Sequence, residues 1–359
     1  VIYGDALAEL KKLPDGIVQC CVTSPPYFGL RDYGTATWEG GDEKCDHKIP
    51  ATESDPKQVF DGSSGSHAIR FNRTQCHKCG AKRIDQQLGL EKTPEEYVAK
   101  MVEIFREVKR VLKSDGVLFL NLGDSYSTNA GDPNKVGGFQ GDSIRSGRNP
   151  YVANRPAYKS SGIKPKDLCG IPWRVAFALQ QDGWWLRQDI IWAKPNPMPE
   201  SVTDRCTKSH EYIFLLSKSA TYYCDMKAIA EPKAESSFER VKYPRFSPNN
   251  KGFSGEYAVV GVNYSEKEKA EMNRNKRSVW TINTEPYPEA HFAVFPPEIP
   301  SLCIQAGSRP GDLVCDPFCG SGTSLQVAKQ LGRSYLGIEL NEKYLPLIER
   351  RLQQETLKF

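Results

Sequence analysis

The chain has 359 residues, of which 39% are hydrophobic and 26% charged, and its formal net charge is +4. A chain of this length and composition can bury a full core, so one large domain with inserted segments is expected. The weakly basic charge permits a polyanionic partner without requiring one. No uninterrupted apolar stretch approaches the roughly 20 residues of a membrane helix, which argues against a membrane protein.

The cysteines indicate the cellular compartment. There are eleven, an odd number scattered along the whole chain. This pattern is typical of a reducing compartment rather than of a disulfide framework, so clustered cysteines are expected to bind a metal or to be buried. The first residues, V-I-Y-G-D-A, show neither a basic leader nor a cleavage site. A cytoplasmic location is therefore expected.

The N-terminal third is predicted to alternate helices and strands. Apolar residues at helical spacing predict a helix over residues 6–13, and the apolar run over residues 17–22 predicts a strand that T-S-P-P-Y ends. A longer helix is predicted over residues 94–112, with Thr93 as its N-cap and a proline at its first position. Residues 114–116 then predict a turn, which the buried strand V-L-F-L-N-L follows.

The same alternation continues to the end of the chain. The further predicted elements are helix 173–181, strand 186–192, strand 212–217, strand 313–315, helix 324–331, strand 334–338 and helix 342–352. This order predicts an α/β fold, a doubly wound and mostly parallel sheet with helices on both faces. Three polar, irregular stretches interrupt it, at residues 35–90, 127–165 and 226–278.

A glycine-rich segment, L-V-C-D-P-F-C-G-S-G-T-S-L, follows the predicted strand that ends at Asp316. Gly320 and Gly322 allow a tight turn and a close approach of the backbone to a ligand. Thr323 or Ser324 is expected to cap the next helix, whose amino end then points at that ligand. The alternative is a glycine turn that merely joins a strand to a helix.

The next predicted strand ends at Glu339. Its interval from Gly320 is close to the roughly 20 residues at which an acidic group reaches the ribose hydroxyls of a bound nucleoside. The sequence G-S-G-T-S-L lacks the third glycine or the lysine of a pyrophosphate site. Asp316 beside the loop would repel phosphates and favour a cationic ligand, and S-adenosylmethionine carries a sulfonium and an ammonium group.

D-P-F-C-G-S-G-T and T-S-P-P-Y together resemble motifs of the DNA amino-methyltransferases. In that family an F-x-G-x-G loop binds S-adenosylmethionine, and an [S/D/N]-P-P-[Y/F/W] peptide carries catalysis. The order, with the catalytic peptide first, resembles the beta-type permutation. G-V-L-F-L-N-L-G-D-S, L-R-Q-D-I-I-W-A-K-P-N-P-M-P and H-F-A-V-F-P-P-E-I-P also resemble family segments in the expected order.

This resemblance covers nearly the whole chain apart from the three irregular stretches. It implies a Rossmann-like catalytic domain formed by residues 1–34, 91–225 and 279–359. Residues 35–90 would then be an inserted zinc-binding segment, and residues 226–278 a target-recognition region. The resemblance further implies a DNA-associated protein of a prokaryote or phage that belongs to a restriction-modification system. A cognate restriction endonuclease and a homodimer are both possible partners under this resemblance.

The catalytic role would fall to Ser24, Pro25, Pro26 and Tyr27. An exocyclic amine is a poor nucleophile because its lone pair is delocalised into the base. The Ser24 hydroxyl and the Pro25 carbonyl can accept hydrogen bonds from its two N–H groups and free that lone pair for in-line attack. Consecutive prolines hold the carbonyl in place, and a base flipped out of the duplex can stack on Tyr27. A rigid turn is the alternative interpretation of this peptide.

The serine at the first position bears on the target base. Family members with S-P-P-Y resemble cytosine-N4 enzymes more often and those with D-P-P-Y adenine-N6 enzymes, so cytosine N4 is favoured and adenine N6 is the alternative. Cytosine-C5 chemistry needs a P-C motif, which does not occur. Methylation of RNA or protein, and a non-catalytic DNA-binding protein of the same fold, are the remaining alternatives.

Four further residues resemble cofactor contacts of the family by their position. Asp5 resembles its acidic residue near the adenine, and Phe318 is expected to flank the cofactor. Phe295 and Pro296 resemble the segment that covers the methionine end. Ordinary packing is the alternative for each.

Four soft or borderline ligands form two half-sites, C-x-H at Cys45 and His47 and C-x-x-C at Cys76 and Cys79. Their segment has few apolar residues with which to fold on its own, so a structural, tetrahedral zinc knuckle is expected. His77 could replace His47, and free cysteines in a loop are the alternative. Catalytic zinc is not expected, because no H-x-E motif accompanies the cysteines.

Sequence-specific contacts to double-stranded DNA are expected from the irregular stretches. The segment R-V-K-Y-P-R-F-S-P-N-N-K has no acidic residue and is suited to phosphates and base edges. Its candidate DNA-binding residues are Arg240, Lys242, Arg245 and Lys251, interleaved with Tyr243 and Phe246 and followed by Arg274, Lys276 and Arg277. The 127–165 loop adds Lys135, Arg145, Arg148 and Arg155. A solvated charged face is the alternative.

Overall fold

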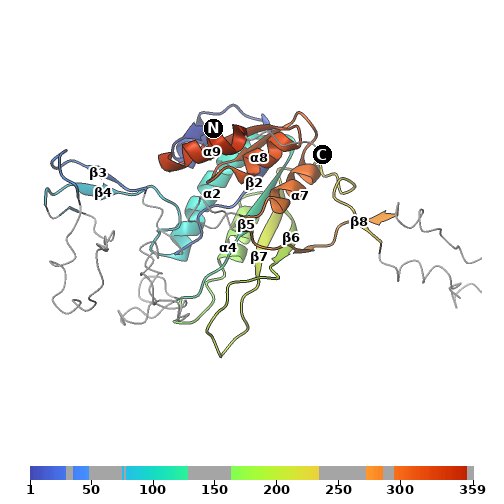
Figure 1. Ribbon diagram of the computed structural model, residues 1–359, viewed down its shortest axis with the longest axis horizontal. Helices are drawn as coiled ribbons and strands as arrows, with labels where there is room; N and C mark the ends of the chain where they lie inside the picture. The colour runs from blue at the N-terminus through green and yellow to red at the C-terminus, as the bar shows by residue number, and fades with distance from the viewer. Residues whose placement is uncertain are drawn as a thin grey trace, which may run out of the picture.

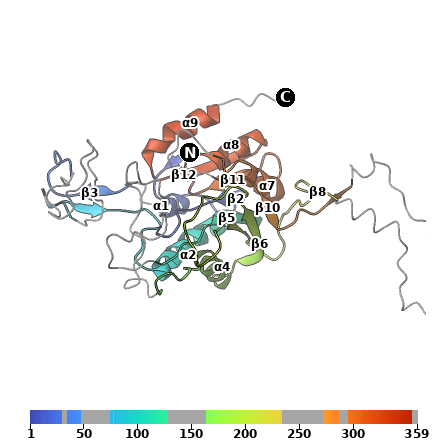
Figure 2. The same cartoon turned by 60° about the horizontal axis from the view of Figure 1, so that its bottom comes forward.

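The computed structural model describes residues 1–29, 35–47, 75–76, 78–127, 163–233, 272–285 and 295–353. Its centre is an eight-stranded sheet with the order β1-β12-β11-β2-β5-β7-β6-β10. Helices lie on both faces of this sheet, so the described chain forms three layers (Figure 1, Figure 2). The predicted α/β architecture is confirmed.

The first half of the chain supplies one helical layer and the central strands. Its elements are β1 (Ile2–Tyr3), α1 (Ala6–Lys11), β2 (Val18–Thr23), α2 (Pro94–Val111), β5 (Leu112–Leu122) and α4 (Ile171–Gln181). The N-cap of α2 is the predicted one, because the amide of Glu96 donates to Thr93 Oγ1 at 3.1 Å. Two acidic residues in its first turn and two basic residues in its last suit the helix dipole.

The second half completes the sheet and the other helical layer. Its elements are β6 (Trp185–Ala193), β7 (His210–Ser217), β10 (Val279–Thr281), α7 (Glu298–Gly307), β11 (Leu313–Asp316), α8 (Thr323–Gln330), β12 (Ser334–Glu339), the 3₁₀ turn η2 (Glu342–Tyr344) and α9 (Leu345–Gln353). Across the sheet, the neighbouring strands β1, β12, β11, β2 and β5 pair parallel to one another. Strand β7 is antiparallel to both β5 and β6.

Alternating side chains of the strands build two separate cores. Leu118 and Leu120 of β5 pack with α2 and α4 on one face, and Val117 and Phe119 pack with α7 and α8 on the other. These side chains are at most 2% exposed. The run V-L-F-L-N-L is apolar at successive positions because both faces of this strand are covered.

Some predicted elements differ from the structure. Residues 114–116 do not form a turn but belong to β5, where a register shift between Val18 and Cys20 of β2 accommodates them. The predicted helix 342–352 is divided into η2 and α9. Helix α7 was not predicted, although buried Ile299, Cys303 and Ile304 recur at helical spacing.

Two small hairpins extend from the sheet in opposite directions (Figure 1). Strands β3 (Thr37–Glu39) and β4 (Lys82–Ile84) pair antiparallel within the stretch predicted to be an insertion. Strands β8 (Glu231–Pro232) and β9 (Asn273–Arg274) pair antiparallel within the second such stretch. Both insertions therefore leave and re-enter the fold through paired strands.

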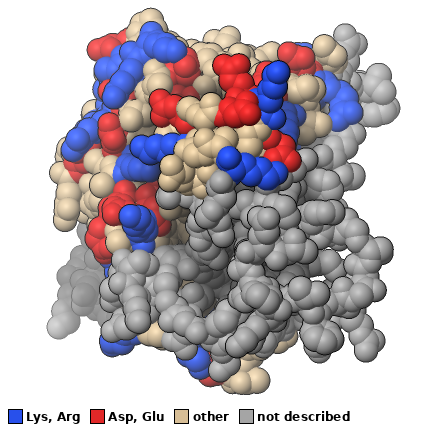
Figure 3. Space-filling model, turned by 90° about the vertical axis from the view of Figure 1, so that its left-hand side faces the viewer, with Lys and Arg blue, Asp and Glu red and all other residues tan. Residues whose placement is uncertain are grey.

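On the face shown in Figure 3, Lys and Arg side chains are interspersed with Asp and Glu over the described surface. This mixture agrees with the small net charge of +4. Among the described residues, no helix combines the length and the hydrophobicity that a membrane span requires.

Candidate functional site

A cavity of about 440 Å³ lies where the parallel strands β2, β11 and β12 end, next to α1. Ligands of open α/β sheets bind at this edge. The sequence-predicted residues that line the cavity are Asp5, Ser24, Pro26, Phe295, Phe318, Gly320, Thr323 and Glu339. The predicted residues Pro25, Tyr27, Pro296, Asp316 and Gly322 are not among its lining residues. The structure thus brings the two ends of the chain to one cavity.

The turn between β11 and α8 has the backbone geometry that glycine permits. Gly320 and Gly322 have φ values of 53° and 82°, in the left-handed region. A Cβ on Gly322 would also lie 3.0 Å from Ile348 Cγ2. The amide of Gly320 donates to Glu339 Oε2 at 2.9 Å, so the glycine turn and the end of β12 are tied together.

The expected cap of α8 is wrong. Gly322 is the N-cap residue, and no side chain caps the helix. Ser324 instead donates to Asp316 Oδ2, and buried Arg351 of α9 donates to Thr323 Oγ1 and to both oxygens of Ser321. The hydroxyl groups that sequence reasoning assigned to capping therefore fix the loop to its neighbours.

Asp316 is only 1% exposed and joins β11 to β2 and α8. Its carboxylate accepts hydrogen bonds from Thr23 Oγ1 at 2.6 Å, from Ser324 Oγ at 2.5 Å and from the amide of Phe318 at 3.0 Å. Burial raises the pKa of Asp316 to about 6, against the lowering effect of these hydrogen bonds. Asp316 does not line the cavity, and its role in favouring a cationic ligand stays a prediction.

Glu339 does line the cavity, at the end of β12. Burial raises its pKa to about 7, and hydrogen bonds from the amides of Asn341 and Gly320 oppose that rise. Next to Glu339, just after the strand β1 that pairs with β12, Asp5 is the N-cap of α1 and accepts the amide of Ala8 at 2.9 Å. Four acidic residues, Asp5, Asp85, Glu103 and Glu339, therefore line a concave site together with apolar side chains, a composition typical of small-molecule sites.

The base of the first hairpin forms another wall that sequence reasoning missed. Thr35 and residues 85–88 line the cavity. Thr35 Oγ1 donates to Asp85 Oδ1 at 3.4 Å, and Arg83 forms an ion pair with Asp85 at 2.9 Å. No sequence signal identified these residues, because the stretch lacks a periodic pattern.

The S-P-P-Y peptide follows β2 directly and is held on several sides. The hydroxyl of Tyr97 in α2 donates to the carbonyl of Pro26 at 2.9 Å, and the amide of Gly29 donates to the carbonyl of Gly89. The ring of Tyr27 lies so close to Gly123 that a Cβ there would be 2.5 Å from Tyr27 Cε2. A larger side chain at position 123 would therefore displace the Tyr27 ring.

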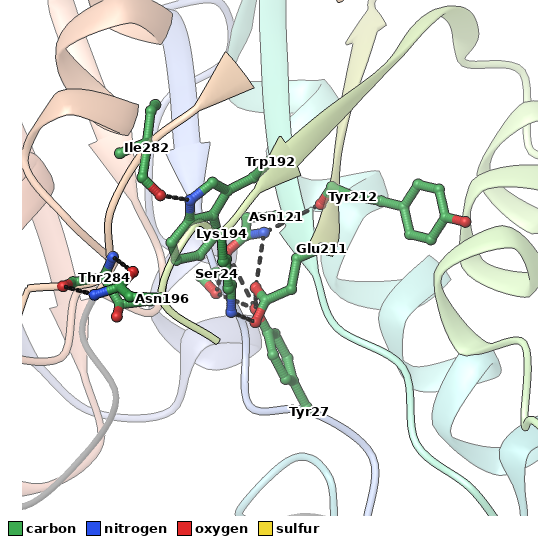
Figure 4. A network of polar contacts seen from close by, with 10 residues as sticks. All are labelled: Ser24, Tyr27, Asn121, Trp192, Lys194, Asn196, Glu211, Tyr212, Ile282 and Thr284. Atoms are coloured by element: carbon green, nitrogen blue, oxygen red, sulfur yellow. Dashed lines mark hydrogen bonds and ion pairs between the residues drawn. The ribbon is translucent and has the colours of Figure 1, made fainter. Parts of the chain in front are cut away.

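Behind this peptide lies a polar network (Figure 4). Ser24 Oγ is 3.2 Å from Asn121 Oδ1, and Tyr27 Oη is 3.1 Å from the same oxygen. Tyr27 Oη also donates to Glu211 Oε2 at 2.6 Å, and Glu211 Oε1 pairs with Lys194 Nζ. Sequence reasoning missed Asn121, Lys194 and Glu211, although the first two lie in the family-like segments.

The four predicted metal ligands lie together at the first hairpin. Their ligand atoms are all within 4.8 Å of one another, with Cys45 Sγ 3.8 Å from Cys76 Sγ and Cys79 Sγ 3.5 Å from His47 Nδ1. Hydrogen bonds from the backbone amides of Ala81 and Asp42 lower the pKa of Cys79. His77 is outside the described residues.

The predicted DNA-binding residues Arg240, Lys242, Arg245 and Lys251 lie outside the described residues, as do Tyr243, Phe246 and the four basic residues of the 127–165 loop. Of the basic residues that follow, Arg274 and Arg277 both form ion pairs with Glu231. Lys276 Nζ lies 6.0 Å from the centre of the Trp280 ring. The described basic residues therefore hold the β8–β9 hairpin.

An open α/β sheet with a glycine turn, an acidic strand end and a cavity between them defines a Rossmann-like nucleoside-binding protein. The chain belongs to the N6/N4 methyltransferase family of DNA methylases, whose model matches residues 18–350. It is 40% identical to the type II methyltransferase M.Cfr9I of Citrobacter freundii, over 98% of this chain and 87% of that protein. It is also 40% identical to M.SmaI of Serratia marcescens, over 98% and 90%.

Solved structures share the fold at lower identity. The PvuII DNA methyltransferase, described as cytosine-N4-specific, is 16% identical, with a TM-score of 0.54 over 99% of this chain and 86% of that one. TTHA0409 of Thermus thermophilus, described as a putative DNA modification methylase and complexed with S-adenosylmethionine, is 20% identical, with a TM-score of 0.50 over 98% and 91%. The chain is thus a DNA methyltransferase of the type II, N4/N6 class.

Proposed function

We propose that this methyltransferase transfers a methyl group from S-adenosylmethionine to the exocyclic N4 amine of cytosine in duplex DNA. The observation that carries the proposal is that Ser24, Gly320 and Glu339 line one cavity. The first belongs to the S-P-P-Y peptide, and the other two to the opposite end of the chain. A site for methyl transfer needs the acceptor and the methyl donor at a common cavity.

The adenosine end of the cofactor is assigned to the glycine turn and to Glu339, whose carboxylate would accept the ribose hydroxyls. Asp5 would serve the adenine, and Phe318 and Phe295 would flank the ligand. Thr323 lines the cavity beside the glycine turn, and Gly322, Asp316 and Pro296, which do not line it, are assigned to support these contacts. The fold shared with TTHA0409, a protein solved with S-adenosylmethionine bound, is compatible with this ligand.

For the transfer itself, the target base leaves the duplex and enters the cavity. Ser24 Oγ and the Pro25 carbonyl accept hydrogen bonds from the two N–H groups of its amine. These bonds reduce the delocalisation of the nitrogen lone pair into the ring and make the lone pair available for attack. As the nitrogen–methyl bond forms, the sulfonium–methyl bond breaks and leaves a neutral thioether. The nitrogen then releases one proton to solvent, and Tyr27 stacks on the base throughout.

Cytosine N4 is chosen because Ser24 stands at the first position of the peptide. The PvuII enzyme that shares the fold is described as cytosine-N4-specific. Adenine N6 offers the same conjugated amine, so the target base has to be identified chemically.

Methyl transfer is tested with the full chain, labelled S-adenosylmethionine and duplex DNA of mixed sequence. Nuclease digestion and mass spectrometry are expected to yield N4-methylcytosine, and RNA of the same sequence is expected to remain unlabelled. A product of N6-methyladenine would overturn the choice of base. Labelled RNA with unlabelled DNA would overturn the choice of substrate class.

A structural zinc ion held by Cys45, His47, Cys76 and Cys79 is the second part of the proposal. With Zn–S about 2.3 Å and Zn–N about 2.0 Å, a tetrahedron separates two sulfurs by about 3.8 Å and a sulfur from a nitrogen by about 3.5 Å. The separations of 3.8 Å and 3.5 Å in this cluster match both values. The ion would hold residues 35–90 as a folded insertion.

The zinc proposal is tested by elemental analysis of the purified chain. One zinc per chain is expected, and Cys76→Ser should lose it, whereas Cys206→Ser, at an exposed cysteine outside the cluster, should retain it. Cobalt replacement should give the absorption of a tetrahedral thiolate complex. A wild-type chain that is free of metal after purification in zinc-containing buffer would refute the assignment.

Residues 226–278 are assigned to target recognition, with Arg240, Lys242, Arg245 and Lys251 on phosphates and base edges. The likeness to type II methyltransferases supports, as a further part of the proposal, a cognate endonuclease with the same recognition sequence. Such an enzyme acts where the chromosome lies, in the cytoplasm of its host.

A further inference from the structure

The side-chain amide of Asn121 has one defined orientation. Its Nδ2 donates to Glu211 Oε2 at 3.2 Å and to the carbonyl of Tyr212 at 3.1 Å. An ionised carboxylate and a backbone carbonyl offer acceptors only. The NH₂ group must therefore face these two oxygens, and Asn121 Oδ1 must face Ser24 and Tyr27.

The carboxylate of Glu211, which accepts these hydrogen bonds, is paired with a positively charged side chain. Lys194 Nζ forms an ion pair with Glu211 Oε1, and the two side chains are 18% and 16% exposed. Lys194 also lies 4.1 Å from the centre of the Trp192 ring. In Figure 4 Lys194, just after β6, and Glu211 of the antiparallel strand β7 both point toward the S-P-P-Y peptide.

The orientation of Asn121 determines the polarity of Ser24. Ser24 Oγ has two acceptors on this side, Asn121 Oδ1 at 3.2 Å and Tyr27 Oη at 3.3 Å, whose own proton goes to Glu211, so the serine proton points into this network. Ser24 Oγ then presents lone pairs on its other side. This polarity is the one that the target amine requires, because the amine offers Ser24 an N–H donor.

We propose that Glu211, paired with Lys194, is a positioning residue that acts through Asn121 to make Ser24 a hydrogen-bond acceptor for the target amine. This inference rests on the proposed function, because it assigns Ser24 the role of binding that amine. It adds a chain of three side chains, from β5, from β7 and from the residue that follows β6, that sets the direction of one hydroxyl proton. Tyr27 shares the chain, since its hydroxyl donates to Glu211.

Glu211→Gln isolates this effect, because glutamine has nearly the same shape but can also donate. Glutamine can place a donor where one of the two acceptors of the Asn121 NH₂ group stood, so only the Tyr212 carbonyl still fixes the amide, and the Ser24 proton is held less firmly. A small misplacement transmitted to a reacting group can cost up to about 100-fold in rate. The expected result is a fall of that size in kcat, with the Kd for S-adenosylmethionine and the thermal midpoint unchanged.

Glu107→Gln is the matched control. Glu107 accepts a hydrogen bond from Arg110 at 2.7 Å, its side chain is 21% exposed, and it does not line the cavity. The control should retain wild-type kcat. A Glu211→Gln enzyme with wild-type kcat, or one whose loss appears in KM alone, would overturn the inference.

A double-mutant cycle with Ser24→Ala tests the route through Ser24. Single-turnover rates with excess enzyme should show that Glu211→Gln costs less than about twofold once the serine hydroxyl is absent, because its effect has no target left. Additive losses would overturn the route. If Glu211→Gln does not fold, Asn121→Ala replaces it in the same cycle with the same expected non-additivity. A wild-type enzyme that methylates no DNA refutes the proposed function itself, whereas an unchanged Glu211→Gln enzyme refutes this inference alone.

Discussion

At the scale of single residues, the proposed chemistry depends on the Ser24 hydroxyl. Ser24→Ala removes an acceptor of the target amine while the glycine turn and Glu339 remain intact. By analogy with the loss of one transition-state hydrogen bond, kcat should fall about 100-fold. Isothermal titration should give a nearly unchanged Kd for S-adenosylmethionine. A parallel loss of cofactor binding and turnover would contradict the separate roles of the two segments.

Tyr27 is expected to act on the base rather than on the cofactor. Stacking of a base on an aromatic ring is worth about 1 to 3 kcal/mol, so Tyr27→Ala should weaken turnover by about 5- to 150-fold. Cofactor affinity should again be retained. Tyr27→Phe keeps the ring and loses the contact with Glu211, and its rate should lie between those of Tyr27→Ala and wild type.

Gly123 gives a test of the position of the Tyr27 ring. A Cβ at residue 123 would lie 2.5 Å from Tyr27 Cε2, well inside the contact distance of about 3.5 Å, so the ring must move by about 1 Å. A misplacement of that size costs about 100-fold in rate. Gly123→Ala should therefore lose activity with little change in cofactor affinity. Wild-type kinetics for this variant would show that the ring position is unimportant.

Glu339 gives cofactor binding a defined pH dependence. Burial raises the pKa of Glu339 to about 7, and the ionised form is the one that accepts two ribose hydroxyls. The Kd for S-adenosylmethionine should therefore rise as the pH falls below about 7, by about tenfold per unit in the limit. Glu339→Gln should bind more weakly and flatten this profile. A pH-independent Kd between pH 5 and 8 would contradict the assignment.

The same raised pKa of Glu339 gives the folding stability of the ligand-free protein the opposite pH dependence from that of ligand binding. Because the folded pKa of Glu339 is above its usual value of 4.5, folding favours the protonated form. Its contribution to stability is present below pH 4.5 and is lost as the pH rises through about 7. The ligand-binding group therefore opposes the stability of the empty protein near neutral pH.

At the scale of elements, the inserted hairpin and the cofactor cavity are one structural unit. Thr35 lies just before β3, Asp85 lies just after β4, and both line the cavity. Removal of zinc by a chelator should loosen the hairpin and weaken S-adenosylmethionine binding by about tenfold or more. Added zinc should restore it. A chelated protein with the wild-type Kd would show that the hairpin and the cavity are independent.

Local sequence patterns predicted the elements around the cofactor loop well. The two glycines predicted a tight turn, and Gly320 and Gly322 do have positive φ values there. Thr93 caps α2 as expected. The cap of α8 was mispredicted because Ser324 and Thr323 bind Asp316 and Arg351, which are remote partners. Capping rules describe local competition and do not include a buried arginine from another helix.

The Asn121–Glu211–Lys194 network could not be predicted for a related reason. Strand β7 pairs antiparallel with β5 in a register that sets Asn121 opposite Ile213, and this brings Asn121 close to Glu211. Lys194 follows the end of β6, which pairs with β7. An alternation of helices and strands predicts parallel neighbours and gives no such register. The residues were visible in the sequence, but their proximity depends on the strand direction.

At the scale of the whole molecule, the fold places residues from opposite ends of the chain at one edge of the sheet. Strand β2 pairs with β11, so the S-P-P-Y peptide after β2 and the glycine turn after β11 leave adjacent strands. Both predicted insertions re-enter through paired strands, β3–β4 and β8–β9, which preserves the sheet between them. The doubly wound architecture thus explains how catalysis and cofactor binding can be encoded so far apart.

The most direct test is a crystal structure of the full chain with S-adenosylmethionine bound. The ribose is expected on Glu339, the adenosine beside Gly320, and the sulfonium methyl directed toward Ser24. A cofactor bound at any other edge of the sheet, or a methyl group directed away from Ser24, would contradict the proposed mechanism.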